Sequence, residues 1–146
     1  MRRNSITLSR RHEWFAYLVS FAVFGTGAVW AFLHFLALPP NDFGSASPAE
    51  SWVLKAHGAA AMATLLLVGT LLPMHVKFAW RARRNLRSGL TLLGIFGFLI
   101  LTGYGLYYAG GEELRAWTSQ AHLWVGLALP LFLGGHVWWG KRTRRK

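Results

Sequence analysis

The chain has 146 residues, of which 53% are hydrophobic and 15% aromatic, and its formal net charge is +11. It contains no cysteine, which excludes a covalently attached c-type haem, a thiolate-held iron–sulfur cluster and a disulfide. The sequence also lacks a Ser-His-Asp arrangement, a Walker loop and a dinucleotide fingerprint. Any chemistry must therefore use the six histidines and a bound cofactor.

Four long apolar segments follow one another along the chain. They are Trp14–Leu38, Trp52–Trp80, Leu90–Ala109 and Thr118–Trp139. Each is near or above the twenty or so residues that cross a bilayer, and none has the polar face of a soluble helix. Because a segment in lipid must satisfy its own backbone hydrogen bonds, each is expected to be helical. The sequence predicts an all-α integral membrane protein in which residues 1–146 form a single domain, a four-helix transmembrane bundle.

Basic residues gather at three places: before the first apolar segment, after the second and after the fourth. They are Arg2, Arg3, Arg10, Arg11, Lys77, Arg81, Arg83, Arg84, Arg87, Lys141, Arg142, Arg144, Arg145 and Lys146. The opposite loops carry the acidic residues Asp42, Glu50, Glu112 and Glu113, with only Lys55 and Arg115 as basic residues. By the positive-inside rule, both termini are expected in the cytoplasm.

This charge pattern also bears on location and partners. The basic clusters directly flank apolar segments, so anionic lipid headgroups are the expected partner rather than nucleic acid. The basic start resembles an export signal, but the first apolar segment is too long for one and three more follow. The predicted location is the bacterial cytoplasmic (inner) membrane. The longest predicted linker, from Pro39 to Ser51, is expected on the outer surface, where it could touch a partner.

Four of the histidines form two pairs with helical spacing. His57 and His75 lie eighteen residues apart on the second apolar segment, and His122 and His136 lie fourteen apart on the fourth. Since a helix turns about 100° per residue, each pair lies along one stripe, with separations of roughly 27 Å and 21 Å. Those separations are too wide for one metal ion and are typical of two haems stacked across a membrane.

Depth sorts all six histidines into two layers. The outer layer holds His34, His57 and His122, and the inner layer holds His12, His75 and His136. The second and fourth segments run in the same direction, so their histidines are expected to face each other. The simplest assignment pairs His57 with His122 and His75 with His136. A lone intramembrane histidine more often hydrogen-bonds to a neighbouring helix, but four with matched depth and phase favour haem ligation.

Short motifs accompany these histidines. They are His12-Glu13-Trp14 leading to Thr26-Gly27, Lys55-Ala56-His57-Gly58, Leu101-Thr102-Gly103-Tyr104, and His122 followed by Gly126 and His136. Over essentially the whole chain they resemble the di-haem cytochrome b subunits of membrane formate dehydrogenases and nickel–iron hydrogenases, and bacterial cytochrome b561. The resemblance implies a four-helix bundle with two non-covalent b haems that passes electrons between the quinone pool and a periplasmic or membrane redox subunit.

The resemblance leaves one ligand open. The family places an inner-haem ligand in a His-Trp dipeptide at the start of its first helix. Here Glu13 separates His12 from Trp14, which rotates His12 by about 100° from the expected face. His75 is therefore preferred as the ligand opposite His136, and His12 remains the alternative.

Bis-histidine ligation fills both axial positions of an iron. The chain is therefore expected to act as an electron-transfer subunit without catalytic residues. It is either non-catalytic or reacts only with quinone. A quinone is expected beside whichever of His12 and His75 is not a ligand, near Asn85, Ser88 and the basic residues Arg81–Arg87. We expect His34 to lie near a haem propionate or to contact a ligating histidine, and not to bind an iron itself.

Two other functions fit part of the pattern. A metal or proton transporter could use paired intramembrane histidines, but it would be expected to carry acidic residues within the spans. A structural membrane anchor of a redox complex would make the histidines incidental. Bound haem would distinguish the electron-transfer protein from both alternatives.

Overall fold

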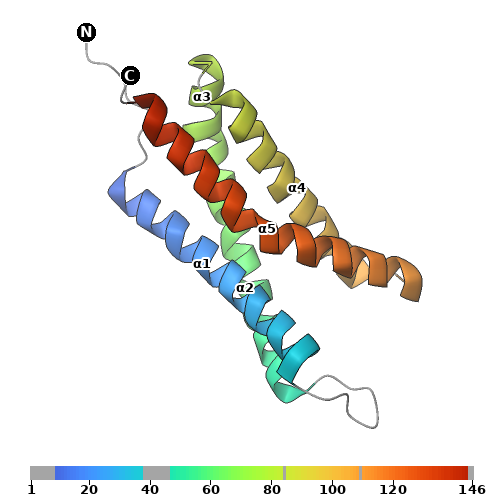
Figure 1. Cartoon of the computed structure of the whole chain (residues 1–146). Helices are drawn as coiled ribbons and strands as arrows, with labels where there is room; N and C mark the ends of the chain where they lie inside the picture. The colour runs from blue at the N-terminus through green and yellow to red at the C-terminus, as the bar shows by residue number, and fades with distance from the viewer. Residues whose placement is uncertain (1–8, 38–46, 84, 109, 145–146) are drawn as a thin grey trace. The chain divides into compact units, whose positions relative to one another are not determined.

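The computed structural model describes residues 9–37, 47–83, 85–108 and 110–144 (Figure 1). These residues form five α-helices and two π-helical turns. The α-helices are α1 Arg10–Phe32, α2 Pro48–Leu71, α3 Lys77–Arg81, α4 Leu86–Tyr108 and α5 Glu112–Arg144. The π-helical turn η1 (Leu33–Ala37) continues α1, and η2 (Leu72–Val76) joins α2 to α3.

Four helical segments among the described residues are long and apolar enough to cross a membrane. They are Arg10–Leu36, Pro48–Leu71, Leu86–Tyr108 and Glu112–Thr143. Large apolar side chains on them stay exposed, including Trp14 at 72% and Leu131 at 79%. Such surfaces are expected where lipid replaces water as the solvent. The prediction of four helices able to span a membrane is thus confirmed by their length and composition.

The first two spans begin several residues before the apolar segments that predicted them, because polar caps start them. The Ser9 hydroxyl accepts a hydrogen bond from the backbone N–H of His12 at 3.3 Å. At α2, Ser47 and Glu50 form a reciprocal capping box, with distances of 3.1 Å and 2.8 Å, and Pro48 occupies the first turn. Such residues satisfy the backbone N–H groups that a helix start leaves without an internal partner.

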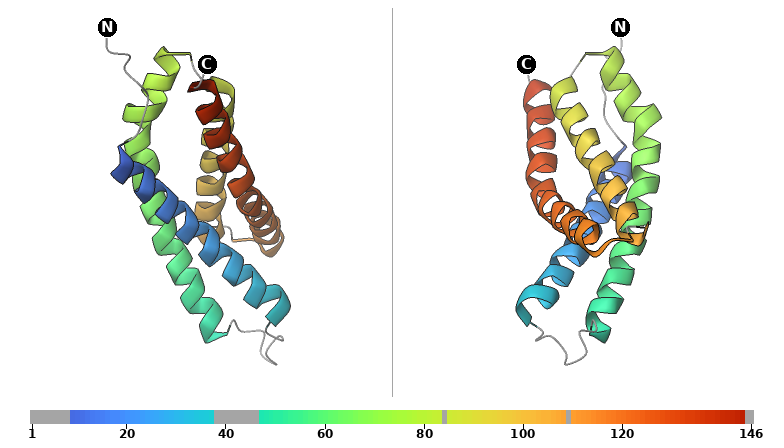
Figure 2. Two further views of the ribbon diagram at one scale, coloured as in Figure 1. Left: turned by 60° about the vertical axis from the view of Figure 1, so that its left-hand side comes forward. Right: turned by 90° about the vertical axis from the view of Figure 1, so that its right-hand side faces the viewer.

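The chain divides into two compact units, Met1–Ala82 and Arg83–Lys146. In the first unit α1 and α2 lie side by side as an antiparallel hairpin, and in the second α4 and α5 do the same (Figure 2). The second unit begins in a tight turn, where Arg83 and Asn85 have φ values of 48° and 53°. Asparagine tolerates this left-handed region better than most residues. Each hairpin therefore provides its own frame for the histidines it carries.

Several sequence predictions fall outside the described residues. They concern Leu38, Ala109, the linker at 39–46 with Asp42, and the basic residues Arg2, Arg3, Arg84, Arg145 and Lys146.

Candidate functional site

Three of the predicted ligands contact a hydroxyl group on the neighbouring helix of their own hairpin. The Nδ1–Oγ distances are 3.1 Å for His57 with Thr26, 2.9 Å for His122 with Thr102 and 3.1 Å for His136 with Ser88. All three rings are half-buried. The same polar contact at the same ring nitrogen therefore recurs at three separate places.

A glycine follows each of these hydroxyl residues and lies against the same ring. A Cβ atom added at Gly27 would lie 3.1 Å from Cε1 of His57, and one at Gly103 would lie 3.3 Å from Cε1 of His122. Both distances are shorter than the usual contact between carbon atoms. At Gly89 the corresponding distance to His136 would be 3.7 Å, an ordinary contact. We call the three dipeptides Thr26–Gly27, Ser88–Gly89 and Thr102–Gly103 ring cradles.

The second hairpin carries two ring cradles at matched spacing. Ser88 and Thr102 lie fourteen residues apart on α4, and His136 and His122 lie fourteen apart on α5. Because the two helices are antiparallel, this spacing brings each histidine to its own hydroxyl. Ser88, which is predicted near a quinone, thus also lies beside a predicted ligand, and the Ser-Gly dipeptide fourteen residues before Thr102-Gly103 is the sequence signal for this contact.

The Ser88 cradle is joined to the turn that begins the second unit. The Ser88 hydroxyl donates to the backbone carbonyl of Asn85 at 3.2 Å, and the Asn85 side chain lies 3.3 Å from the hydroxyl of Thr143 near the end of α5. This series of contacts links the start of α4 to the end of α5 around His136. Asn85 and Ser88, both predicted near a quinone, thus make structural contacts within the hairpin.

His75 and His12 are placed differently from the cradled histidines. His75 lies in η2, two residues after Pro73. A π-helical turn has more residues than an α-helical turn, so the phase calculated from His57 at 100° per residue does not hold through to His75. His12 lies in the first turn of α1, with its Nδ1 3.4 Å from the Ser9 hydroxyl. The choice between them therefore no longer rests on helical phase.

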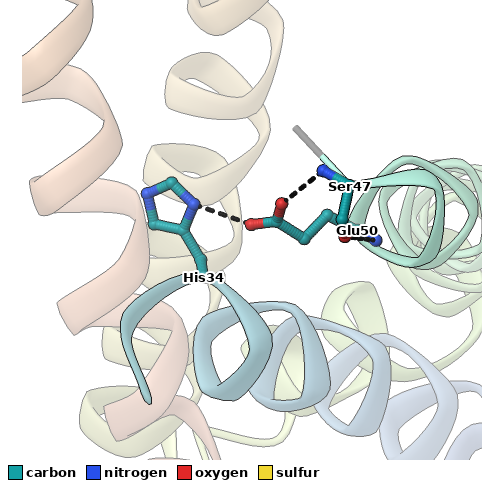
Figure 3. Close-up of polar contacts among 3 residues, drawn as sticks. All are labelled: His34, Ser47 and Glu50. Carbon is teal, nitrogen blue, oxygen red and sulfur yellow. Dashed lines mark hydrogen bonds and ion pairs between the residues drawn. The ribbon is translucent and has the colours of Figure 1, made fainter. Parts of the chain in front are cut away.

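His34 forms a pair with a buried carboxylate (Figure 3). Its Nδ1 lies 2.9 Å from Oε1 of Glu50, which is only 6% exposed, and its ring stacks on Trp30 with centroids 4.7 Å apart. The other Glu50 oxygen accepts the backbone N–H of Ser47. The pair ties η1 to the start of α2. Glu50 is thus more than a charge in an outer loop, and the Ser47-x-x-Glu50 spacing is the sequence signal for its place in a capping box.

Comparison with family models, with curated proteins and with solved structures finds no match for the chain. The functional interpretation therefore depends on the residue pattern and on the geometry of the cradled histidines. Within the described ranges, no three His, Cys, Asp or Glu side chains lie together as they would around a bare metal ion.

Proposed function

We propose that this protein is a membrane electron-transfer subunit that carries two b-type haems and passes electrons between the quinone pool and a redox partner. The observation that carries the proposal is the ring cradle, which recurs at three of the four preferred ligands, His57, His122 and His136. Metal-binding histidines commonly use their second ring nitrogen to contact an oxygen that orients the ring. Three repeats of that arrangement favour ligation over incidental helix packing.

The available side chains fit haem better than a bare ion. A porphyrin supplies four nitrogen ligands itself, so only axial imidazoles are needed from the protein. His57 with His122 would hold one haem, and His136 with His75 or His12 would hold the other. Bound in this way, haem would supply one-electron exchange without an open iron position for substrate. The glycines of the ring cradles would let the ligand rings lie close to the backbone.

The orientation follows from charge. We place both termini in the cytoplasm of a bacterium, with the four spans in its inner membrane, because fourteen of the sixteen Lys and Arg residues fall on one predicted side. A reporter fused after Lys146 is expected to behave as cytoplasmic and one inserted at Ser45 as periplasmic. Activity of a periplasm-specific enzyme at the two positions measures this. High periplasmic activity at the C-terminus would contradict the orientation but not the histidine pairs.

Electron exchange with quinol is the direct test of the proposed role. Under anaerobic conditions, a short-chain quinol added to the purified oxidised protein is expected to produce the absorbance bands of reduced b-type haem. Boiled protein is the control for free haem in solution. A protein that binds haem but is not reduced by any quinol would contradict the quinone part of the proposal. A colourless protein that binds zinc would instead support the transporter, and a colourless protein without metal would support the structural anchor.

Replacing the glycines of the ring cradles with alanine is expected to lower haem retention by different amounts. Gly27→Ala and Gly103→Ala are expected to displace the facing imidazoles, since added methyl groups in tight contacts cost about 1–3 kcal/mol. Haem retention at those positions should fall about tenfold or more. Gly89→Ala is the matched control, because its Cβ would meet His136 at an ordinary 3.7 Å. Haem content per chain, measured after competition with a haem-scavenging apoprotein, reports the effect. Equal retention in all three variants would refute the steric role of the glycines.

A further inference from the structure

We infer that Thr26, Ser88 and Thr102 act as positioning residues that fix the tautomer of three histidines. Each hydroxyl keeps the imidazole proton on Nδ1, so that Nε2 carries the lone pair that a metal would accept. The tautomers follow from the hydrogen bonds alone, and their consequence for iron rests on the proposed function.

The number of hydrogens on each hydroxyl and each imidazole decides which ring nitrogen is protonated. A hydroxyl group has one hydrogen to donate and can accept through its oxygen. The Thr26 hydroxyl donates to the carbonyl of Ala22 at 2.7 Å, and the Thr102 hydroxyl donates to the carbonyl of Phe98 at 2.8 Å. Such bonds to the preceding turn are common for threonine in helices. With that hydrogen used, the hydroxyl oxygen can only accept from the facing ring nitrogen.

The facing nitrogen is Nδ1 in all three cases. It must therefore be the protonated nitrogen of a neutral imidazole, because only one nitrogen of that ring carries a hydrogen.

The strength of this control is expected to differ among the three sites. Threonine is stiff at χ1 because it is branched at Cβ, whereas serine has more rotamer freedom. The carbonyl bond of the Ser88 hydroxyl, 3.2 Å to Asn85 in the left-handed turn, is also longer than the bonds of 2.7 Å and 2.8 Å that Thr26 and Thr102 make. His122 and His57 should therefore be held in the Nδ1–H form more completely than His136.

Nitrogen NMR of the haem-free protein tests this directly. Protein labelled with ¹⁵N-histidine and held in lipid bilayers is measured at about pH 8.5, well above the ordinary histidine pKa of about 6.5, so that the rings are neutral. Protonated and unprotonated ring nitrogens have separate ¹⁵N shifts. The unchanged protein is expected to show Nδ1–H for His57, His122 and His136. An Nε2–H ring at His122 would overturn the inference.

Three variants of α4 make the test specific. Thr102→Val keeps the shape but removes the hydroxyl, so the share of the Nδ1–H form at His122 should fall. Thr102→Ser keeps the hydroxyl and should preserve the Nδ1–H form, which separates loss of the bond from loss of folding. Thr91→Val is the control, because Thr91 makes the same intrahelical bond, to Arg87 at 3.0 Å, outside any ring cradle. An unchanged His122 tautomer in Thr102→Val would also overturn the inference.

The haem-loaded protein gives a second readout. Loss of such an orienting contact commonly weakens metal binding by about 10–100-fold, so Thr102→Val should release one haem correspondingly faster than Thr102→Ser or Thr91→Val. Equal release from all three variants would contradict the role in positioning. If the tautomers are as stated but the purified protein takes up no haem, the proposed function fails and the inference about the hydroxyls stands.

Discussion

Replacing His122 with alanine is expected to remove one haem and leave the other, because the two proposed sites share no ligand. About one b-type haem per chain should remain after purification, and the residual spectrum should be that of a single low-spin site. Pyridine haemochrome analysis against protein concentration measures the content. His34→Ala is the matched histidine control. It breaks the pair with Glu50 but should leave both haems in place.

The double variant His122→Ala with His136→Ala extends this prediction. It removes one axial ligand from each proposed site, and the purified protein should be colourless. Circular dichroism should still show a helical protein, because neither ring is needed for the backbone hydrogen bonds of α5. If the His122→Ala protein kept both haems, the assignment of His122 as a ligand would be wrong.

The second large effect concerns the remaining ligand, for which His75 and His12 compete. If His75 ligates the iron opposite His136, then His75→Ala leaves that iron with a single imidazole and should abolish one low-spin signal in electron paramagnetic resonance. His12→Ala should then preserve both signals and at most shift a potential or slow turnover with quinol. The two variants are compared at equal protein concentration, with total haem measured in parallel.

The reverse outcome would change the assignment. Loss of one low-spin signal in His12→Ala but not in His75→Ala would identify His12 as the ligand. His75 would then become the candidate proton-handling residue for quinone. Its position in η2, beside Pro73, would be consistent with such a role, since π-helical turns are frequent at functional sites.

The spans could be predicted from the sequence because hydropathy over twenty or so residues reports burial in lipid directly. The starts of the first two could not, because the prediction followed apolar residues from Trp14 and Trp52, whereas the helices begin directly after the caps Ser9 and Ser47. Cap signals were present in the sequence. They were outweighed by the stronger apolar pattern that follows them.

The candidate ligands could also be selected from spacing alone, but not the contacts that position them. Spacing identifies which residues share a face of one regular helix. It does not reveal that Ser88 faces His136 across a hairpin or that His34 reaches Glu50, because both contacts depend on how two helices pack. Nor could an assumed constant helical phase anticipate η2, the π-helical turn that contains His75, since such a turn changes the number of residues per turn.

Haem stoichiometry of the unchanged protein tests the central claim most directly. The full chain is produced in bacteria supplied with a haem precursor, purified in mild detergent and analysed as its pyridine haemochrome together with a reduced-minus-oxidised spectrum. The account predicts a red protein with a b-type spectrum and about two haems per chain, one for each predicted pair of axial histidines. A folded, helical protein that is colourless under these conditions would contradict it.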